Sequence, residues 1–263
     1  MNLRACWTMM RVTWMIWFQN RAFFFLLAFG WMISPLVALF IWSTAADGRS
    51  LGGMTQGELV AYYLVFILVN QLTYSQTYWT FGDKIRDGRL SPMLLRPFSP
   101  VLYTLVTEVE GKGVYLLFVV PVSTVLALLL HPKIHVTLPG CLTFVVSLLL
   151  AWFLRFFWGY WIALLAFWVQ RADIALAVQD ACIFLLAGQV APITLLPAPL
   201  RIWAQVLPFR SMISFPVEIL TGHLNPMETV IGLMLQICWS LIASLVFLIL
   251  WRNGLRRYTA IGG

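Results

Sequence analysis

Long apolar segments with almost no charged residues dominate the hydrophobic pattern of this chain. Four windows contain no Asp, Glu, Lys or Arg, namely 22–46, 59–82, 113–130 and 229–251. Two more windows hold one charge each, Arg155 in 136–170 and Asp180 in 174–200. A helix needs about 20 apolar residues to cross a bilayer, and backbone groups in lipid must bond internally. The pattern therefore predicts six transmembrane helices, at roughly 22–43, 59–81, 113–131, 139–168, 174–195 and 228–251.

Composition supports an all-α polytopic membrane protein that forms a single transmembrane domain over residues 1–263. Hydrophobic residues make up 61% of the chain and charged residues 10%, against about 25% charged in soluble domains. With six spans, twelve Lys and Arg residues fall on the side of the two termini and four on the opposite side. Both termini are therefore predicted to be cytoplasmic. This bias and anionic lipid account for the net charge of +7, so no nucleic-acid partner is expected.

Residues 1–20 carry a pattern of their own. Trp7, Met10, Trp14 and Trp17 recur at helical spacing, while Arg4 and similar polar residues fall on another face. This arrangement is typical of a helix that lies in the headgroup layer. We expect an interfacial helix here; a cytosolic extension of the first span is the alternative.

A charged loop, residues 82–112, separates the second and third predicted spans. Gly88 is expected to end the helix that enters the loop. Ser91 and Pro92 have the residue types of an N-cap and a first helical position, and Pro97 would stop the helix within two turns. The pattern predicts a short apolar and basic helix, either docked in a groove of a partner protein or resting on lipid headgroups. The dipeptide Ser99–Pro100 is expected to begin the next helix.

Catalytic and metal-binding motifs are not found in the sequence. It contains no GxxxxGK[ST], GxSxG or HExxH pattern, so nucleotide binding by a P-loop is not expected. His131 and His135 are four residues apart, but Pro132 between them makes a shared helical face improbable, and no metal site is predicted. A membrane-embedded enzyme acting on lipids and a non-transporting scaffold are the alternatives to a transport function.

Polar residues inside the spans are candidates for a transport path. Asn70, Thr73 and Thr77 follow one face of the second span, and Tyr74 lies between them. Gln179 and Gln189 belong to the fifth span. Polar side chains at membrane depth either hold helices together or line a pathway, and the sequence leaves both open.

Arg155 and Asp180 are the intramembrane charges. An unpaired charge in a membrane is costly, so Arg155 is expected to have a partner. Asp180 is the only acid within a neighbouring span, but the two depths differ by roughly 10 Å at 1.5 Å per residue. Asn70 or Gln71 is therefore the alternative partner of Arg155.

The segment 196–227 is rich in proline and too apolar for a free outer loop. We expect short re-entrant helices there, since irregular backbone at membrane depth must be covered by protein or line a water-filled cavity. They would act either as a lid over the exit or as a packing plug.

Two groups of motifs carry a resemblance to a known family. The loop contains DKIRDGRL at Asp83–Leu90 and LLRPFSP at Leu94–Pro100. Downstream are LAGQVAPITLLP at Leu186–Pro197 and FPVEILTG at Phe215–Gly222. These motifs and their order resemble the six-span permeases of the ABC-2 type transporters, over nearly the whole chain.

The resemblance implies a permease of an ATP-driven exporter. A separate ATPase subunit would bind ATP and Mg, so no cofactor is expected in this chain, and the permease would pair with a second copy or a paralogue. The substrate would be a hydrophobic or amphipathic molecule, such as a lipid, a drug or a glycolipid, exported across a bacterial plasma membrane. The loop helix would be the coupling helix that contacts the ATPase, through Ile85, Arg86, Gly88, Arg89, Leu90, Met93, Leu94, Leu95, Arg96 and Pro97.

Overall fold

The computed structural model describes residues 11, 14–15, 19, 21–134, 136–169 and 173–258. Within these residues every regular element is a helix, apart from an isolated bridge between Leu51 and Met54. The expected all-α class is therefore confirmed. The interfacial helix predicted for residues 1–20 lies largely outside the described residues, as does His135.

The helices follow one another along the chain with short connections. They are α2 (Arg21–Ala45), α3 (Gln56–Thr73), α4 (Thr77–Arg86), α5 (Leu90–Leu94), α6 (Pro100–Leu130), α7 (Leu138–Leu164), α8 (Asp173–Leu186), α9 (Ala198–Val206), α10 (Pro208–Met212), α11 (Ser214–Leu220) and α12 (Pro226–Arg257). Two short 3-10 turns, η1 (Leu165–Phe167) and η2 (Ile193–Leu195), complete the list.

Four segments of the described chain are long and apolar enough to cross a membrane. They are Phe25–Ala45, Pro100–Leu130, Leu138–Phe167 and Pro226–Arg257, and they overlap the predicted spans one, three, four and six. Large apolar side chains face outward along them; Leu128 is 71% exposed and Leu241 is 66% exposed. Such a surface is suited to lipid rather than water.

The second and fifth predicted spans differ from expectation. The window 59–81 is divided between α3 and α4, because Tyr74 leaves the helical conformation (φ −54°, ψ 135°). The window 174–195 is helical only to Leu186; Gly188 then adopts a left-handed conformation (φ 82°) and Pro192 follows, which ends a helix. Uninterrupted helices across both windows were therefore a wrong expectation.

The loop between α4 and α6 contains a short helix, but its start differs from the predicted one. Gly88 ends the preceding turn with φ 71°, as expected. Helix α5 begins at Leu90 with Arg89 at the N-cap, so the predicted N-cap role of Ser91 is wrong. The Ser91 hydroxyl instead lies 3.1 Å from the Tyr258 hydroxyl. Ser99 and Pro100 do begin α6.

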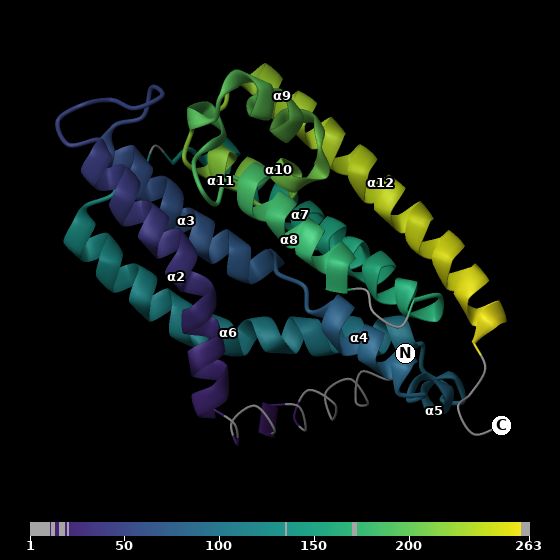
Figure 1. Ribbon diagram of the computed structural model, residues 1–263. Helices are drawn as coiled ribbons and strands as arrows, with labels where there is room; N and C mark the ends of the chain where they lie inside the picture. The colour runs from purple at the N-terminus through teal and green to yellow at the C-terminus, as the bar shows by residue number, and fades with distance from the viewer. Residues whose placement is uncertain are drawn as a thin grey trace.

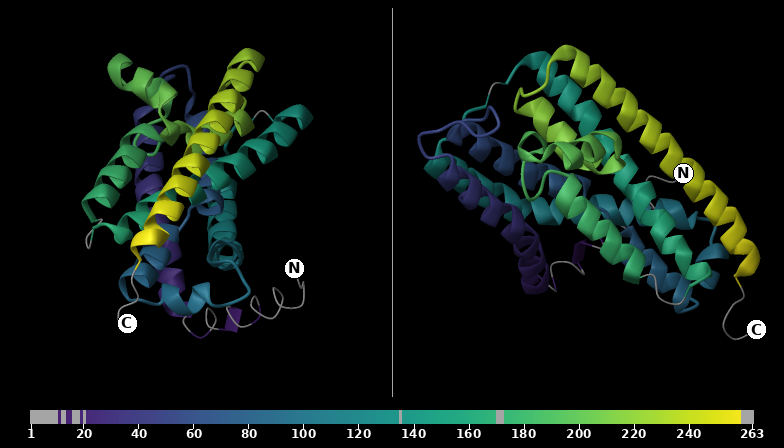
Figure 2. Two further views of the ribbon diagram at one scale, coloured as in Figure 1. Left: turned by 90° about the vertical axis from the view of Figure 1, so that its right-hand side faces the viewer. Right: turned by 45° about the horizontal axis from the view of Figure 1, so that its top comes forward.

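Figure 1 shows the bundle with α5 at one end and α9 at the other, which we call the α5 end and the α9 end. Helix α12 packs along α7, and α3 packs between α2, α6 and α7. Figure 2 shows the short helices α9 to α11 gathered away from α5. Most of the largest fully buried side chains come from α3 and α7, among them Tyr62, Phe66 and Tyr160. These two helices therefore form the core around which the others pack.

Candidate transport cavity and coupling helix

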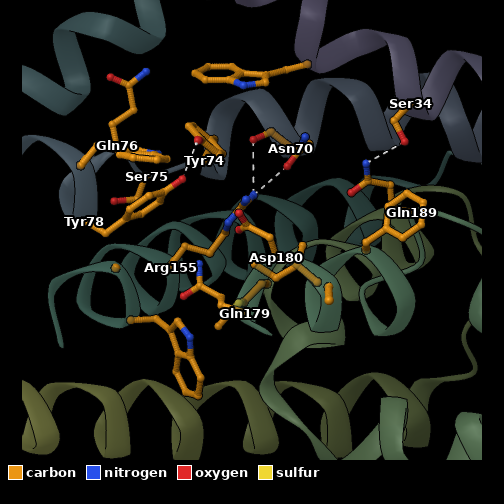
Figure 3. Close-up of a pocket in the computed structure, with 18 of the residues that line it drawn as sticks. Ser34, Asn70, Tyr74, Ser75, Gln76, Tyr78, Arg155, Gln179, Asp180 and Gln189 are labelled. Carbon is orange, nitrogen blue, oxygen red and sulfur yellow. Dashed lines mark hydrogen bonds between the residues drawn. The ribbon is translucent and has the colours of Figure 1, made fainter. Parts of the chain in front are cut away.

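A cavity of about 880 Å³ opens between α2, the α3–α4 junction, α7 and α8. Figure 3 shows the polar side chains that converge on it from these elements. Of the six candidate path residues, Asn70, Tyr74, Gln179 and Gln189 line the cavity. Thr73 and Thr77 are fully buried beside it and do not line it. The structure thus brings together residues of the second and fifth predicted spans that are distant in sequence.

Arg155 lies on the wall of this cavity, 7% exposed. Its Nη1 donates to Asn70 Oδ1 and to Thr73 Oγ1, both at 2.9 Å. The guanidinium also lies 5.4 Å from the centre of the Tyr74 ring. Of the two alternatives to Asp180, Asn70 is therefore a partner of Arg155, whereas Gln71 donates to the carbonyl oxygen of Ala28 at 3.4 Å.

The Arg155–Asp180 ion pair considered from the sequence does not form. Asp180 lines the same cavity, but the salt bridges among the described residues join Arg86 to Asp83, Arg89 to Asp87 and Arg210 to Glu218. The guanidinium of Arg155 is instead directed to Asn70 and Thr73 of α3. The hydrogen-bond partners of the Arg155 guanidinium are consequently neutral groups.

The break between α3 and α4 is held by two charged side chains of α6. Lys112 Nζ donates to the carbonyl oxygen of Tyr74 at 2.6 Å. Ser75 and Thr77 donate their hydroxyl hydrogens to Glu108 Oε1 at 2.5 Å and 2.6 Å. These bonds satisfy polar groups that an interrupted helix would leave unpaired. We call Glu108 and Lys112 the α6 brace. Their spacing of four residues is that of a helical ion pair, but each side chain contacts the break between α3 and α4.

A second polar cluster closes the α9 end of the bundle. Arg210 Nη2 and Glu218 Oε2 form a salt bridge of 2.5 Å, with side chains 14% and 12% exposed. Ser214 Oγ donates to Glu218 Oε1 at 2.5 Å, and the Tyr62 hydroxyl lies 3.0 Å from Ser214 Oγ. Sequence reasoning missed this cluster, because the two charges are separated by a kink between two short helices.

Tyr62 also explains the glycine that ends the fifth predicted span. Its hydroxyl donates to the carbonyl oxygen of Gly188 at 3.1 Å. A Cβ atom at this position would lie 2.1 Å from that hydroxyl. With φ at 82°, the position requires glycine on both conformational and steric grounds.

The candidate coupling residues fall into two groups. Ile85 is 4% exposed and Leu90 is fully buried, so both anchor the loop to the bundle. Leu94 and Leu95 are 41% and 88% exposed. The remaining members at the α5 end that are exposed or partly exposed are Arg86, Gly88, Arg89, Met93, Arg96 and Pro97. Arg86 and Arg89 pair with Asp83 and Asp87 respectively. The exposed apolar surface of the loop is therefore the Leu94–Leu95 pair.

The apolar helices and the polar cavity between them define a helical membrane protein of the transport class. The chain belongs to the ABC-2 family of transporter proteins, whose family model matches residues 29–262. This match confirms the resemblance found in the sequence and makes the chain a transmembrane transporter component, in a family that is generally non-enzymatic. Searches of curated proteins and of solved structures returned no match.

Proposed function

We propose that this chain is the permease subunit of an ABC exporter, driven by a separate ATPase that docks on α5. The observation that carries the proposal is the position of the broken helix. Its break, residues 74–76, lines the polar cavity, and the short helix α4 connects the break directly to the α5 loop. One continuous segment therefore joins a surface suited to a partner protein with a surface suited to a substrate.

The proposed coupling is mechanical. The ATPase pushes on Leu94 and Leu95, and α4 transmits the displacement to the break. Tyr74, Tyr78 and Trp79, which line the cavity on both sides of the break, then move relative to α7. Helices are stiff and breaks are flexible points, so hinge motion at such a break is an ordinary route for conformational change. The α6 brace would limit how far the hinge opens.

A hydrophobic or amphipathic substrate enters from the cytoplasm or the inner leaflet of a bacterial plasma membrane in this proposal. The basic residues support the orientation, since they favour both termini and the α5 loop in the cytoplasm. Reporter fusions at Gly263 and within residues 47–53 would then report opposite sides of the membrane. Fusions that report the same side would contradict the six-span topology.

A second permease, either a copy of this chain or a paralogue, completes the cavity in this proposal. The support is the surface of α8, which packs on α9 and α10. Ile174 and Val178 on this helix are 81% and 58% exposed. Helices α2 and α8 both contribute to the cavity wall, so a partner packed against them would enclose it.

Co-purification of the ATPase tests the proposal. The permease is co-expressed with each candidate ABC ATPase of the same genome, and Leu94→Asp with Leu95→Asp is expected to abolish co-purification while the permease stays in the membrane. Ile134→Asp with Val136→Asp is the matched control, because these exposed residues lie on the opposite side in the proposed topology. Normal co-purification and transport by the Leu94 and Leu95 variant would refute the docking site.

A further inference from the structure

Arg155 keeps part of its hydrogen-bonding capacity unused. All of its hydrogen bonds within the described chain leave from Nη1 and end on Asn70 and Thr73. Nε and Nη2 make no hydrogen bond to the described residues. Because Arg155 lines the cavity, these two nitrogens remain available to a molecule inside it. Two parallel N–H donors of a guanidinium match the oxygens of a phosphate or carboxylate.

No carboxylate of the described part of the chain forms a salt bridge with Arg155, although the charges of Glu108 and Asp180 act on it from a greater distance. Asp180 lines the same cavity without forming an ion pair. Glu108 Oε1 accepts from two hydroxyls at the helix break. A buried charge without a partner of opposite sign is costly in a membrane. An anionic group bound in the cavity would offset that cost.

Aromatic side chains form part of the walls around Arg155. The rings of Trp31 and Tyr74 lie 4.3 Å apart, and those of Tyr78 and Trp79 lie 4.9 Å apart. Trp158 completes the apolar lining. Aromatic side chains present large apolar surfaces, which suit the tail or ring system of a ligand rather than a fully hydrated ion.

We infer that the cavity binds an anionic amphiphile, with its acidic headgroup on Arg155 and its apolar body against the aromatic walls. This inference rests on the proposed export function and names the substrate class. Gln179 Oε1, on the same cavity wall, is buried without a hydrogen-bond partner. A hydroxyl on the headgroup would donate to it. Asp180 then lies near the anion and weakens its binding.

Binding of radiolabelled dodecyl phosphate to the full chain tests this inference. The permease is held in phosphatidylcholine nanodiscs, and the signal of empty nanodiscs is subtracted. Unlabelled dodecyl phosphate is expected to compete, whereas dodecyltrimethylammonium is not. Inorganic phosphate at the same concentration should compete at least tenfold less well, because it lacks the apolar body. Equal competition by the cationic amphiphile, or by inorganic phosphate, would overturn the assignment.

Variants identify the headgroup site. Arg155→Gln should weaken dodecyl phosphate binding at least tenfold, Arg155→Lys should retain part of it, and Asp180→Asn should strengthen it. Arg252→Gln is the matched control, since this exposed arginine of α12 lies outside the cavity and binding should be unchanged. Binding by Arg155→Gln equal to that of the unaltered chain would overturn the inference.

A cavity-filling variant covers the case in which Arg155→Gln does not fold. Gly30 lines the cavity, and a Cβ atom there meets nothing within 4 Å. Gly30→Trp directs a large side chain into this space and should lose binding; its thermal melting shows whether it folds, and unchanged binding in the folded variant contradicts the site. The binding assay needs no ATPase. If dodecyl phosphate does not bind but the ATPase co-purifies, only the ligand class is refuted. If dodecyl phosphate binds but no ATPase co-purifies, only the proposed ATPase partner is refuted.

Discussion

Arg155 and Arg210, two arginines with little exposed surface, have opposite surroundings. Arg210, at the α9 end, forms a salt bridge with Glu218. The Glu218 carboxylate also accepts a hydrogen bond from the Ser214 hydroxyl. Arg155, on the cavity wall, bonds only through Nη1, to Asn70 and Thr73, which are neutral. Both charges are removed from water. One charge has a carboxylate at salt-bridge distance, and the other has only neutral hydrogen-bond partners.

The difference separates a structural charge from a functional one. A salt bridge with additional hydrogen bonds holds short helices together but leaves nothing for a ligand. An arginine that bonds only to neutral groups beside a cavity keeps N–H donors free for a ligand. The protein bears the energetic cost of that buried charge. The α9 end of the bundle is therefore closed by its own contacts, whereas the cavity near the helix break is kept open.

Breaking the Arg210–Glu218 pair should have the largest effect on stability. Arg210→Met leaves Glu218 buried without its partner, which typically costs about 3–5 kcal/mol. We expect little assembled protein, as measured by size-exclusion chromatography and thermal melting in detergent. The double variant Arg210→Met with Glu218→Leu should recover much of this, because apolar pairs replace buried ion pairs well. An Arg210→Met variant with the melting temperature of the unaltered chain would contradict the structural role assigned to Arg210.

Breaking the α6 brace should have an intermediate effect. Lys112→Met leaves the carbonyl oxygen of Tyr74 unpaired at the helix break, and hydrogen bonds to charged groups contribute about 1.5–3 kcal/mol. Thermal melting measures the loss. Lys133→Met is the matched control, since this lysine is exposed in the loop before α7. Equal melting of the two variants would show that the break does not depend on Lys112.

Removing Arg155 should cost less than removing Arg210. Arg155→Leu leaves neutral acceptors unpaired, at about 1–3 kcal/mol, and strands no carboxylate at salt-bridge distance. Adding Asp180→Asn should therefore recover no stability. Recovery of the melting temperature by the double variant would instead establish the Arg155–Asp180 pair.

Removing the Tyr62 hydroxyl should have the smallest effect. Tyr62→Phe deletes the bonds to Ser214 and to the carbonyl oxygen of Gly188 but keeps the ring in the core. Each of these hydrogen bonds contributes about 1 kcal/mol, so the two together account for about 1–2 kcal/mol. A small fall in melting temperature with unchanged dodecyl phosphate binding would assign this contact to the structural cluster. A loss of binding would connect the two regions and weaken the comparison.

Sequence patterns predicted the apolar helices well and the interruptions poorly. Apolar windows with at most one charge locate α2, α6, α7 and α12 because a long apolar run has few other folds available. The break at 74–76 depends on Glu108 and Lys112, which reach it from α6 about thirty residues later in the chain. No local pattern contains that contact. The start of α5 likewise depends on the distant Tyr258, whose hydroxyl meets Ser91.

The candidate site was partly predictable for the same reason. The helical face of Asn70 and its neighbours, and the depth of Arg155, follow from spacing alone. Which of them line the cavity depends on how α3 is rotated against α7 and α8, and Thr73 and Thr77 turn out to be buried. The Arg210–Glu218 pair spans two short helices whose relative orientation the sequence does not specify.

The most direct test is the accessibility of the cavity during ATP binding. Gly30→Cys is placed in a chain whose four cysteines, Cys6, Cys141, Cys182 and Cys238, are replaced by alanine. A water-soluble thiol reagent then labels it in the reconstituted complex of permease and ATPase. ATP should change the labelling rate severalfold, and it should not do so in the Leu94→Asp, Leu95→Asp variant. A rate that ATP leaves unchanged in the complex would contradict coupling between α5 and the cavity.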